Sequence, residues 1–320
     1  MIETFVTVSD AGFFVGTVAL LNSLRLTGNA GRIVVVDRGL TDRQRALLEP
    51  HASVLATGVD LAAIDPWLLK PVSAALVTDG IVLLVDSDMI VTASLSKAVE
   101  AARAGKIFAY PDHWTAVQRR FAEWEQLLGL ERPVRSGQTY VNAGFVAFSR
   151  DAWPHLLDRL AELCRRIPPE TVRQGARDLP LWAGDQDALN ALLMSEIPQA
   201  ALEIGDVDEE VSDDAMGKAV VDSRSLRCTY RDKPVSILHH SMTPKPWRPE
   251  AWRRTRRDDA YVRLLPRLLF ATDLPLRLAP RDVPLWLRGD VRAHAMLAGI
   301  SVLREASAPF RRLRRPRNPL

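Results

Sequence analysis

The chain has 320 residues, of which 47% are hydrophobic and 25% are charged. This composition is typical of a globular protein and excludes fibrous and intrinsically disordered classes. Two cysteines are too few for a disulfide framework or a cysteine-rich zinc site, and they fit a reducing compartment. The first residues lack the basic segment of a secretory signal, and the longest apolar stretch, residues 13–21, is too short to span a bilayer. We therefore expect a cytoplasmic protein.

Charge is distributed unevenly along the chain, although the formal net charge is only +3. Residues 1–247 contain 25 Lys and Arg against 32 Asp and Glu, whereas residues 248–320 contain 17 Arg and no Lys against 7 acidic residues. We therefore divide the chain into a main domain, residues 1–247, and an Arg-rich helical extension, residues 248–320. The positive charge of the extension points to an anionic partner.

A run of arginines at residues 311–317 ends the extension and follows an apolar, helix-like stretch around residues 286–303. Near an anionic leaflet each arginine contributes about 1 kcal/mol, which is enough for reversible attachment but not for insertion. This predicts peripheral association with the inner face of the cytoplasmic membrane, with a solvated basic tail as the alternative. A nucleic-acid partner is not expected, because no aromatic residues alternate with the arginines.

In the first 150 residues, apolar runs alternate with helix-like stretches. The patterns predict strands at Thr4–Val8, Arg32–Val36, Ile81–Val85 and Ile107–Tyr110, and helices at Phe13–Leu26, Asp42–Glu49 and Ala93–Ala104. Strands and helices that alternate in this way form βαβ units on a parallel sheet. The run 81–85 is apolar throughout, as expected of a central strand covered on both faces, although a buried helix segment would look the same.

The later part of the chain predicts a less regular succession of elements. We expect helices at Thr115–Leu130, from Asp151 and at Asp185–Met194, strands at Tyr140–Phe148 and Val235–Leu238, and loops at residues 129–139, 168–184 and 205–217. After Trp247, helix-forming segments are broken by prolines, including Pro266. The chain as a whole predicts an α/β fold in which helices flank a mixed, mostly parallel central sheet.

Two aspartates, Asp86 and Asp88, follow the predicted strand 81–85. Side chains alternate along a strand, so these two carboxylates are expected to point the same way. They lie at the carboxyl end of a strand, where open α/β sheets bind ligands. A divalent cation would relieve their mutual repulsion, and hard oxygen ligands suit Mg²⁺ or Mn²⁺. A solvated turn is the alternative interpretation.

A second polar group follows the last predicted strand, where His239 and His240 precede Lys245 and Trp247. A neutral imidazole as a third metal ligand would favour Mn²⁺ over Mg²⁺. Lys245 is a point charge suited to phosphate oxygens, and the prolines on both sides of it restrict its backbone. A structural histidine and a solvated lysine are the alternatives.

Three further positions combine polar side chains with special backbone requirements. Gly144 follows Asn142 within a predicted strand, where a glycine indicates that another group approaches closely. Asp185 begins a helix and is either a simple N-cap or, with Gln186, part of a pair suited to sugar hydroxyls. Asp10 follows the first strand, at the sheet edge where a nucleotide base or ribose would lie.

The joint order of these motifs resembles the family 8 glycosyltransferases over residues 2–247. In that family a strand with an acidic loop, a metal-binding Asp-x-Asp, an Asn-x-Gly strand, an Asp-Gln-Asp sequence and a closing His…Lys-Pro-Trp follow one another, as at residues 7–10, 86–88, 142–144, 185–187 and 239–247. The resemblance implies a GT-A type nucleotide-sugar-binding fold. It also implies a metal-dependent, retaining transfer of a hexose from a nucleotide diphosphate sugar, with a UDP-sugar as expected donor, to a saccharide, glycolipid or other lipid-linked acceptor.

The resemblance also implies roles for individual residues. The expected ligands of Mn²⁺, or of Mg²⁺ in its place, are Asp86, Asp88 and His239. The expected catalytic residues, which would contact the donor sugar, are Asp185 and Gln186. The expected donor-binding residues are Asp10 for the uracil or ribose, Lys70, Asp86, Ser87, Asn142 for the sugar, and Lys245 for the diphosphate.

The sequence departs from the family pattern at several of these positions. Gly12 and Phe13 replace the more usual Asn-Tyr, which predicts a different recognition of the base. Met242 replaces a glycine through which the backbone approaches the diphosphate. His240 competes with His239 for the metal, although the spacing to Lys245 favours His239. No carboxylate nucleophile is evident, so we expect front-face attack supported by the amide of Gln186.

Two other functions stay open at the level of sequence. A phosphohydrolase of the haloacid dehalogenase type also places Asp-x-Asp after an apolar strand, but it expects Thr or Val where Ile90 stands and an acid where Leu189 stands. A catalytically silent, membrane-associated GT-A scaffold is the second alternative. The presence of every polar group that the transfer reaction needs disfavours it.

Overall fold

The computed structural model describes residues 1–56, 66–112, 122–135, 137–174, 179–248, 259–284 and 287. Its strands are β1 Glu3–Ser9, β2 Arg32–Asp37, β3 Ser53–Ala56, β4 Ile81–Val85, β5 Met89–Val91, β6 Ile107–Pro111, β7 Val141–Ser149, β8 Leu202–Ile204, β9 Glu210–Ser212, β10 Val220–Val221, β11 Cys228–Tyr230, β12 Lys233–Pro234 and β13 Ile237–His239. Its helices are α1 Phe14–Leu26, α2 Asp42–Leu48, α3 Pro66–Ala74, α4 Ser96–Arg103, α5 Trp124–Leu128, α6 Leu156–Arg165, α7 Pro169–Gln174, α8 Asp185–Ser195 and α9 Ala260–Phe270, with the short 3₁₀ turns η3 Gln199–Ala201, η4 Asp213–Lys218 and η6 Pro280–Asp282.

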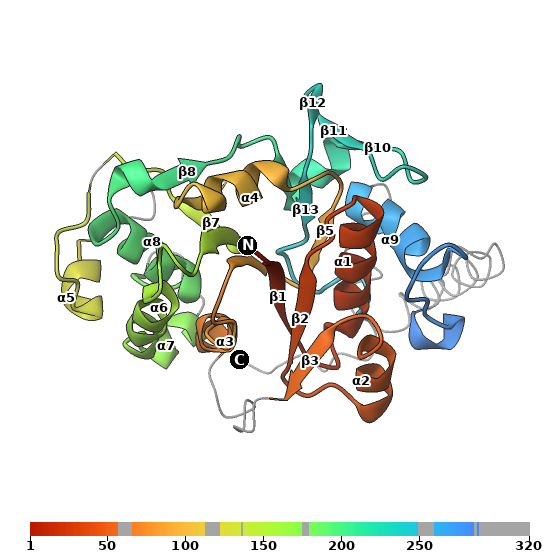
Figure 1. The fold of residues 1–320 in the computed structure, drawn as a ribbon, viewed down its shortest axis with the longest axis horizontal. Helices are drawn as coiled ribbons and strands as arrows, with labels where there is room; N and C mark the ends of the chain where they lie inside the picture. Colours follow the sequence, from red (N-terminus) through yellow and green to blue (C-terminus); the bar gives the residue numbers. More distant parts are fainter. Residues whose placement is uncertain are drawn as a thin grey trace, which may run out of the picture.

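The central sheet of the described residues has the strand order β3-β2-β1-β4-β7-β6-β8. Strands β1 to β4 run parallel to one another, and β8 runs parallel to β6. Only β7 among these strands is antiparallel to its neighbours β4 and β6. The predicted α/β fold with a mixed, mostly parallel sheet between helices is therefore confirmed (Figure 1).

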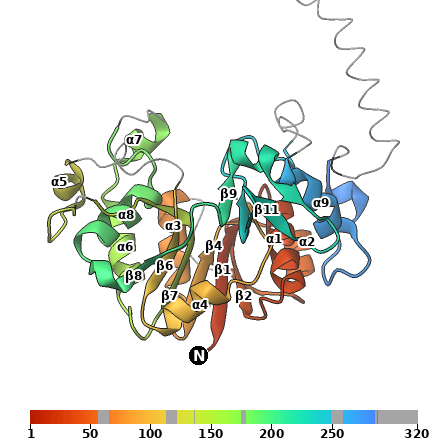
Figure 2. The ribbon, with the colours of Figure 1, turned by 90° about the horizontal axis from the view of Figure 1, so that it is seen from above.

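Alternation along the strands supplies apolar side chains to both faces of the sheet. Phe5 and Leu83 belong to the core on the side of α1, α4 and α9, whereas the adjacent Val6 and Leu84 belong to the core on the side of α3, α6 and α8. Figures 1 and 2 show these helices on the two sides of the strands. Burial on both faces explains why β4 is apolar at every position, and its bounds match the predicted strand.

Two small sheets of three strands each lie beside the central one. In the first, β13 pairs with β5 in antiparallel register and with β9 in parallel register, and β10, β11 and β12 form the second. The prediction of a surface loop at residues 205–217 is therefore wrong, because this segment contains β9 and η4. β9 is a strand because its backbone pairs with the buried strand β13, and the acidic sequence by itself did not indicate this pairing.

Three other segments differ from the sequence-based expectations. The helix expected from Asp151 begins at Leu156, and the expected loop 168–184 contains the short helix α7. The expected helix Thr115–Leu130 is represented by α5, while residues 113–121 lie outside the described residues. Helix α9 continues through Pro266, which was expected to break it. Packing of the buried leucines of α9 outweighs the backbone hydrogen bond that the proline removes.

Residues 259–284 and Leu287 pack onto the main domain. The amide of Asn22, on the buried face of α1, donates hydrogen bonds to the carbonyls of Leu268 and Leu276 at 2.8 and 2.7 Å, and the core extends to Leu287. The division at residue 247 stays a prediction, and the arginine run at 311–317 lies outside the described residues. None of the described helices combines the length and apolarity needed to cross a membrane.

We predict that Asp37→Asn lowers the free energy of unfolding by about 1–3 kcal/mol at pH 7. Asp37 is buried at the end of β2, and it accepts hydrogen bonds from the backbone of Gly39 and Leu40 and from Arg45. Burial alone would raise the pKa of Asp37, but these hydrogen bonds lower it below its usual value. The stabilisation is therefore present above the unfolded-state pKa and is lost as the pH falls through the folded-state pKa.

Urea denaturation of both proteins at pH 7 and pH 3 measures this effect. The difference between them should shrink at the lower pH. The matched control is Asp42→Asn, because that carboxylate is fully exposed and, among the described residues, pairs with Arg45 alone. Equal losses in the two variants would contradict the assignment.

Candidate functional site

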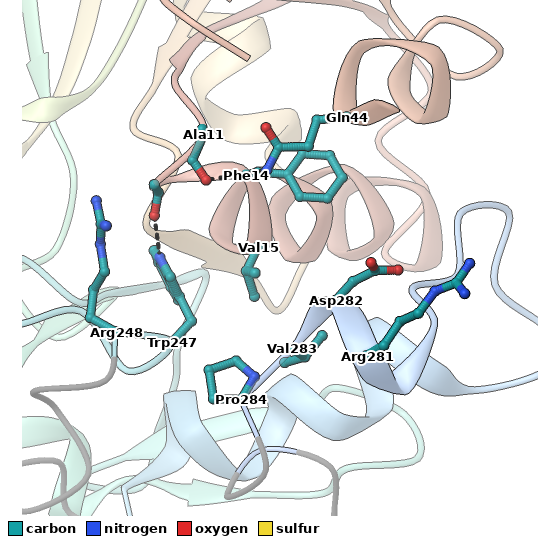
Figure 3. Close-up of a pocket in the computed structure, with 11 residues that line it drawn as sticks. Ala11, Phe14, Val15, Gln44, Trp247, Arg248, Arg281, Asp282, Val283 and Pro284 are labelled. Atoms are coloured by element: carbon teal, nitrogen blue, oxygen red, sulfur yellow. Dashed lines mark hydrogen bonds between the residues drawn. The ribbon is translucent and has the colours of Figure 1, made fainter. Parts of the chain in front are cut away.

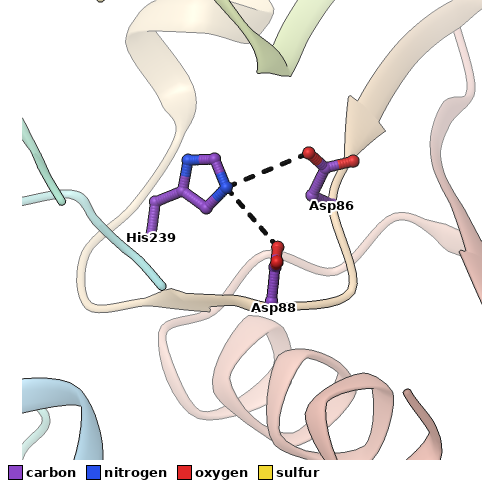
Figure 4. A group of neighbouring side chains, drawn as sticks. All are labelled: Asp86, Asp88 and His239. Carbon is purple, nitrogen blue, oxygen red and sulfur yellow. Dashed lines mark ion pairs between the residues drawn. The ribbon is translucent and has the colours of Figure 1, made fainter. Parts of the chain in front are cut away.

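Two carboxylates and an imidazole meet at the carboxyl end of β4. Nε2 of His239 lies 3.9 Å from Oδ2 of Asp86 and 3.5 Å from Oδ1 of Asp88 (Figure 4). One ligand atom from each of the three residues lies within 4.8 Å of the others. Residues more than 150 positions apart in the chain are thus brought together, as expected for the three predicted metal ligands.

The local reason for this convergence differs from the one we inferred. The carboxylates do not project from a continuing strand, because residues 86–88 form a tight turn in which the N–H of Met89 donates to the carbonyl of Asp86 at 3.1 Å. The turn leads into β5, whose Met89 is paired in register with His239 of β13. The antiparallel pairing therefore sets the imidazole against the turn.

His239 and His240 face opposite ways, as adjacent residues at a strand end do. The backbone N–H of His240 donates to the carbonyl of Asp88 at 3.1 Å, while its ring packs edge-on against Tyr261 of α9, with 5.5 Å between ring centroids. Burial lowers the pKa of His240, so the ring is neutral at pH 7. Of the two histidines, His239 is the one placed to bind a metal with the two aspartates.

The cluster is strongly coupled electrostatically. Burial opposes charge on Asp88, but Lys245, with its ammonium 2.7 Å from Oδ2, and His239 hold the pKa of that carboxyl well below its usual range. Burial likewise opposes charge on His239, but the nearby carboxylates of Asp88 and Glu210 raise its pKa to about 10. Oδ1 of Asp88 is buried and accepts no hydrogen bond. A buried carboxylate oxygen that faces an imidazole but accepts no hydrogen bond is an arrangement that a cation would complete.

Lys70 connects this cluster to the start of α8. Its ammonium lies 2.7 Å from Asp86 and 3.6 Å from Asp185, and it donates to the carbonyl of Ala143 at 2.9 Å. Burial would lower the pKa of Lys70, but the two aspartates raise it well above its usual value. The pKa of Asp185 is raised, chiefly by its burial. The structure therefore places Lys70 and Asp185 beside the aspartate pair.

Gln186 and Asn142 are held by the backbone of β7. The side-chain oxygen of Gln186 accepts a hydrogen bond from Ala143 at 3.1 Å, and its nitrogen donates to Asp112. The side-chain oxygen of Asn142 accepts from the N–H of Gly144 at 2.6 Å. Both amides thus have fixed orientations at the edge of the site, and Tyr140 adds a second contact to Gln186 at 3.4 Å.

Residues 239–247, called here the closing segment, are hydrogen-bonded to the residues just before α1. The indole of Trp247 donates to the carbonyl of Gly12 at 2.7 Å, and Lys245 donates to the carbonyls of His240 and Ser241. Asp10 caps the turn before α1 by accepting from the N–H groups of Gly12 and Phe13. In the described part of the chain, no contact joins Asp10 directly to the metal-ligand cluster.

Ser87 and Met242 differ in their exposure. Ser87 is buried within the turn, and its carbonyl lies against Gly16 of α1. Met242, which replaces a family glycine, is 53% exposed. Its N–H donates to Asp213 at 3.1 Å, so the backbone at this position is engaged with the η4 turn.

Sequence reasoning missed Glu210, Asp112 and Tyr140. Glu210 is buried, and its Oε1 lies 3.0 Å from Nδ1 of His239. It belongs to the acidic segment that we took for a surface loop, so its sequence carried no sign of burial. Tyr140 was expected to begin a strand. The only signal for its contact with Gln186 was its spacing from Asn142.

A cavity of about 500 Å³ lies beside Trp247, between the start of α1 and the residues around η6. Phe14, Val15 and Trp247 contribute apolar walls, and Arg248 and Arg281 stand on opposite sides of them (Figure 3). Neither guanidinium has a carboxylate partner among the described residues, because the aspartate of this cavity, at position 282, pairs with an arginine of α2. The cavity is therefore amphipathic and cationic.

The fold is that of the GT-A glycosyltransferases. No protein-family model matches the chain, and no curated protein matches its sequence. Among solved structures, apo WbbM, a bifunctional glycosyltransferase, is 15% identical with a TM-score of 0.54, over 86% of this chain and 50% of that one. The galactosyltransferase LgtC in complex with donor and acceptor sugar analogues is 17% identical with a TM-score of 0.53, over 84% of this chain and 98% of that one. The chain thus spans half the length of WbbM.

We predict that Gly144→Ala destabilises the protein by about 1–3 kcal/mol. A Cβ at this position would lie 2.8 Å from Cε1 of His239 and would also collide with the side chain of Met89. Glycine is required here because β7 passes directly against the imidazole, not because of an unusual backbone angle. Urea denaturation measures the loss, and stability unchanged within about 0.5 kcal/mol would contradict this close packing.

Proposed function

We propose that the protein is a metal-dependent, retaining glycosyltransferase that moves a hexose from a UDP-sugar to a saccharide or lipid-linked acceptor. The observation that carries this proposal is the convergence of Asp86, Asp88 and His239 at the carboxyl end of β4 in a GT-A fold. Open α/β sheets bind ligands at this edge. Lys70 and Lys245 flank the cluster and supply positive charge for an anionic donor.

The three side chains suit a divalent cation. Two carboxylates and one imidazole form a hard donor set with one nitrogen, which fits Mn²⁺ and, less well, Mg²⁺. The buried, unsatisfied oxygen of Asp88 supports the same interpretation. A cation bound there would neutralise the negative charge that develops on the departing nucleoside diphosphate.

The remaining site residues would bind and orient the donor. Lys245 would contact the diphosphate, and Asp185 and Asn142 would contact sugar hydroxyls. The ion pair with Lys70 holds Asp185 in place, and the hydrogen bond from the backbone of Gly144 holds Asn142. Asp10 and Ser87 would line the nucleoside side. These roles follow from the family resemblance and from the placement of the side chains.

The transfer itself breaks the bond between the anomeric carbon and the diphosphate oxygen, whose electron pair leaves with the diphosphate. A new bond forms to an acceptor hydroxyl, whose proton passes to the leaving oxygen in a front-face reaction with retention. Gln186 would stabilise the positive charge that develops on the sugar, because its amide is held by Ala143 and Asp112. An LgtC variant with an active-site glutamine changed to glutamate is among the similar structures, at 16% identity and a TM-score of 0.51 over 84% of this chain and 98% of that one.

We predict that Asp88→Asn lowers Mn²⁺-dependent UDP-sugar hydrolysis or transfer by at least about 100-fold. The loss follows from removing one metal ligand charge while the fold is kept. A screen of UDP- and GDP-sugars with and without Mn²⁺, with products analysed by mass spectrometry, measures it. The matched control is Asp79→Asn, an exposed carboxylate before β4.

Activity of the Asp88→Asn variant at the wild-type rate would contradict the metal assignment. Hydrolysis of a simple aryl phosphate without any sugar nucleotide would favour the phosphohydrolase alternative. The absence of calorimetric binding of any nucleoside diphosphate in Mn²⁺ would favour the silent scaffold.

We also propose that the amphipathic cavity binds the apolar, anionic part of a lipid-linked acceptor at a cytoplasmic membrane face. Apolar walls between two guanidinium groups match a phosphate carried on a hydrocarbon chain. The arginine run at residues 311–317 would supply further attraction to an anionic leaflet. Its contribution is tested by comparing liposome co-sedimentation of the full chain and of the chain lacking residues 307–320.

We predict that Arg248→Ala weakens binding of farnesyl phosphate by about tenfold or more, through loss of a charge-assisted hydrogen bond. Calorimetry with farnesyl phosphate, farnesol and inorganic phosphate separates the apolar and anionic contributions. Arg277→Ala is the matched control, because Arg277 is exposed and does not line the cavity. Equal binding by wild type and Arg248→Ala would remove the cavity from the proposal.

A further inference from the structure

Glu210 reaches the candidate metal site from a strand that carries no other residue of the site. β9 lies on the far side of β13 from β5, in the small sheet β5-β13-β9. The parallel register pairs Glu210 with Ile237, two residues before His239. Glu210 therefore approaches the imidazole from the side opposite to the aspartate turn.

The contact between the two side chains is short and buried. Oε1 of Glu210 lies 3.0 Å from Nδ1 of His239, and the side chains are 3% and 6% exposed. Nε2, the other ring nitrogen, is the one directed at Asp86 and Asp88. The imidazole thus bridges a carboxylate on one side and the candidate metal ligands on the other.

A carboxylate does not occupy such a position without cost. Glu210 is fully enclosed, and its second oxygen, Oε2, has no hydrogen-bond partner among the described residues. Replacing a whole buried ion pair, such as that of Glu210 and His239, by apolar side chains of similar volume is often neutral or stabilising for a protein. Stability alone therefore does not account for Glu210, whereas orientation of a metal-binding histidine does.

We propose that Glu210 is a positioning residue that fixes the ring orientation and tautomer of His239 for metal binding. When a cation replaces the proton on Nε2, Nδ1–H would still donate to Oε1 of Glu210, and the lone pair of Nε2 would face the cation between Asp86 and Asp88. The negative charge of Glu210 also makes the imidazole a stronger donor to the cation. This inference rests on the proposed function, because it needs a divalent cation to bind at Asp86, Asp88 and His239.

The inference is tested by measuring Mn²⁺ affinity directly, by calorimetry and by electron paramagnetic resonance of the free ion, in the full chain. We expect Glu210→Gln to weaken Mn²⁺ binding by about tenfold and Glu210→Ala by up to about 100-fold. Glutamine still offers an oxygen to Nδ1–H but lacks the charge, so its effect should be the smaller. Glu209→Gln, at the adjacent half-buried residue paired with Lys97, is the matched control and should bind Mn²⁺ as wild type does.

A second readout separates positioning from general structural damage. If donor hydrolysis is observed, the Mn²⁺ concentration for half-maximal rate should rise in Glu210→Gln while the rate at saturating Mn²⁺ stays within about threefold of wild type. Folding of each variant is checked by thermal denaturation, and Glu210→Gln carries the test if Glu210→Ala does not fold.

The failures of the two proposals are distinguishable. Mn²⁺ affinity of Glu210→Gln within twofold of wild type would overturn the role of Glu210 and leave the metal site intact. Absence of Mn²⁺ binding by the wild-type protein would overturn both the metal-dependent function and this inference.

Discussion

The structure of the site depends on one electrostatic constraint, the compensation of buried and half-buried carboxylates that meet at the carboxyl end of β4. Asp86, Asp88, Asp185 and Glu210 lie close together, and of these Asp88 and Glu210 are buried. An unpaired buried carboxylate costs several kcal/mol, so each of these groups needs a partner. Lys70 pairs with Asp86 and Asp185, Lys245 pairs with Asp88, and His239 pairs with Glu210.

This requirement connects parts of the chain that are distant in sequence. Lys70 reaches from α3 to both the aspartate turn and the start of α8, and Lys245 reaches from the closing segment to Asp88. Removal of the closing segment would leave Asp88 without its ammonium partner. The ion pairs therefore stabilise the same arrangement that a ligand at this edge would need. The hydrogen bond from Trp247 to Gly12 also holds the closing segment against the start of α1.

The regular part of the fold could be predicted because its signals are local. β4 is five apolar residues followed by an abrupt polar stop, and α1 is long enough for its boundaries to be predicted within one residue. β5, β9 and β13 have three residues each, too few to show a period, and they exist because they pair with one another. The burial of Glu210 depends on that pairing, which explains why the motifs at residues 86–88 and 239–247 could be predicted and their buried partner could not.

The charges of the cluster also indicate why a dication would suit it. In the absence of a metal, three cationic side chains face four carboxylates, and the like charge of Asp86 adds to burial in raising the pKa of both Asp185 and Glu210. Exchange of the proton on Nε2 of His239 for a divalent cation would add one positive charge and balance the four carboxylates. The approach of a diphosphate would then be opposed only by carboxylates that are already paired. The positive charge of Lys245 would remain beside the cation, because Lys245 contacts Oδ2 of Asp88 while Oδ1 faces the cluster.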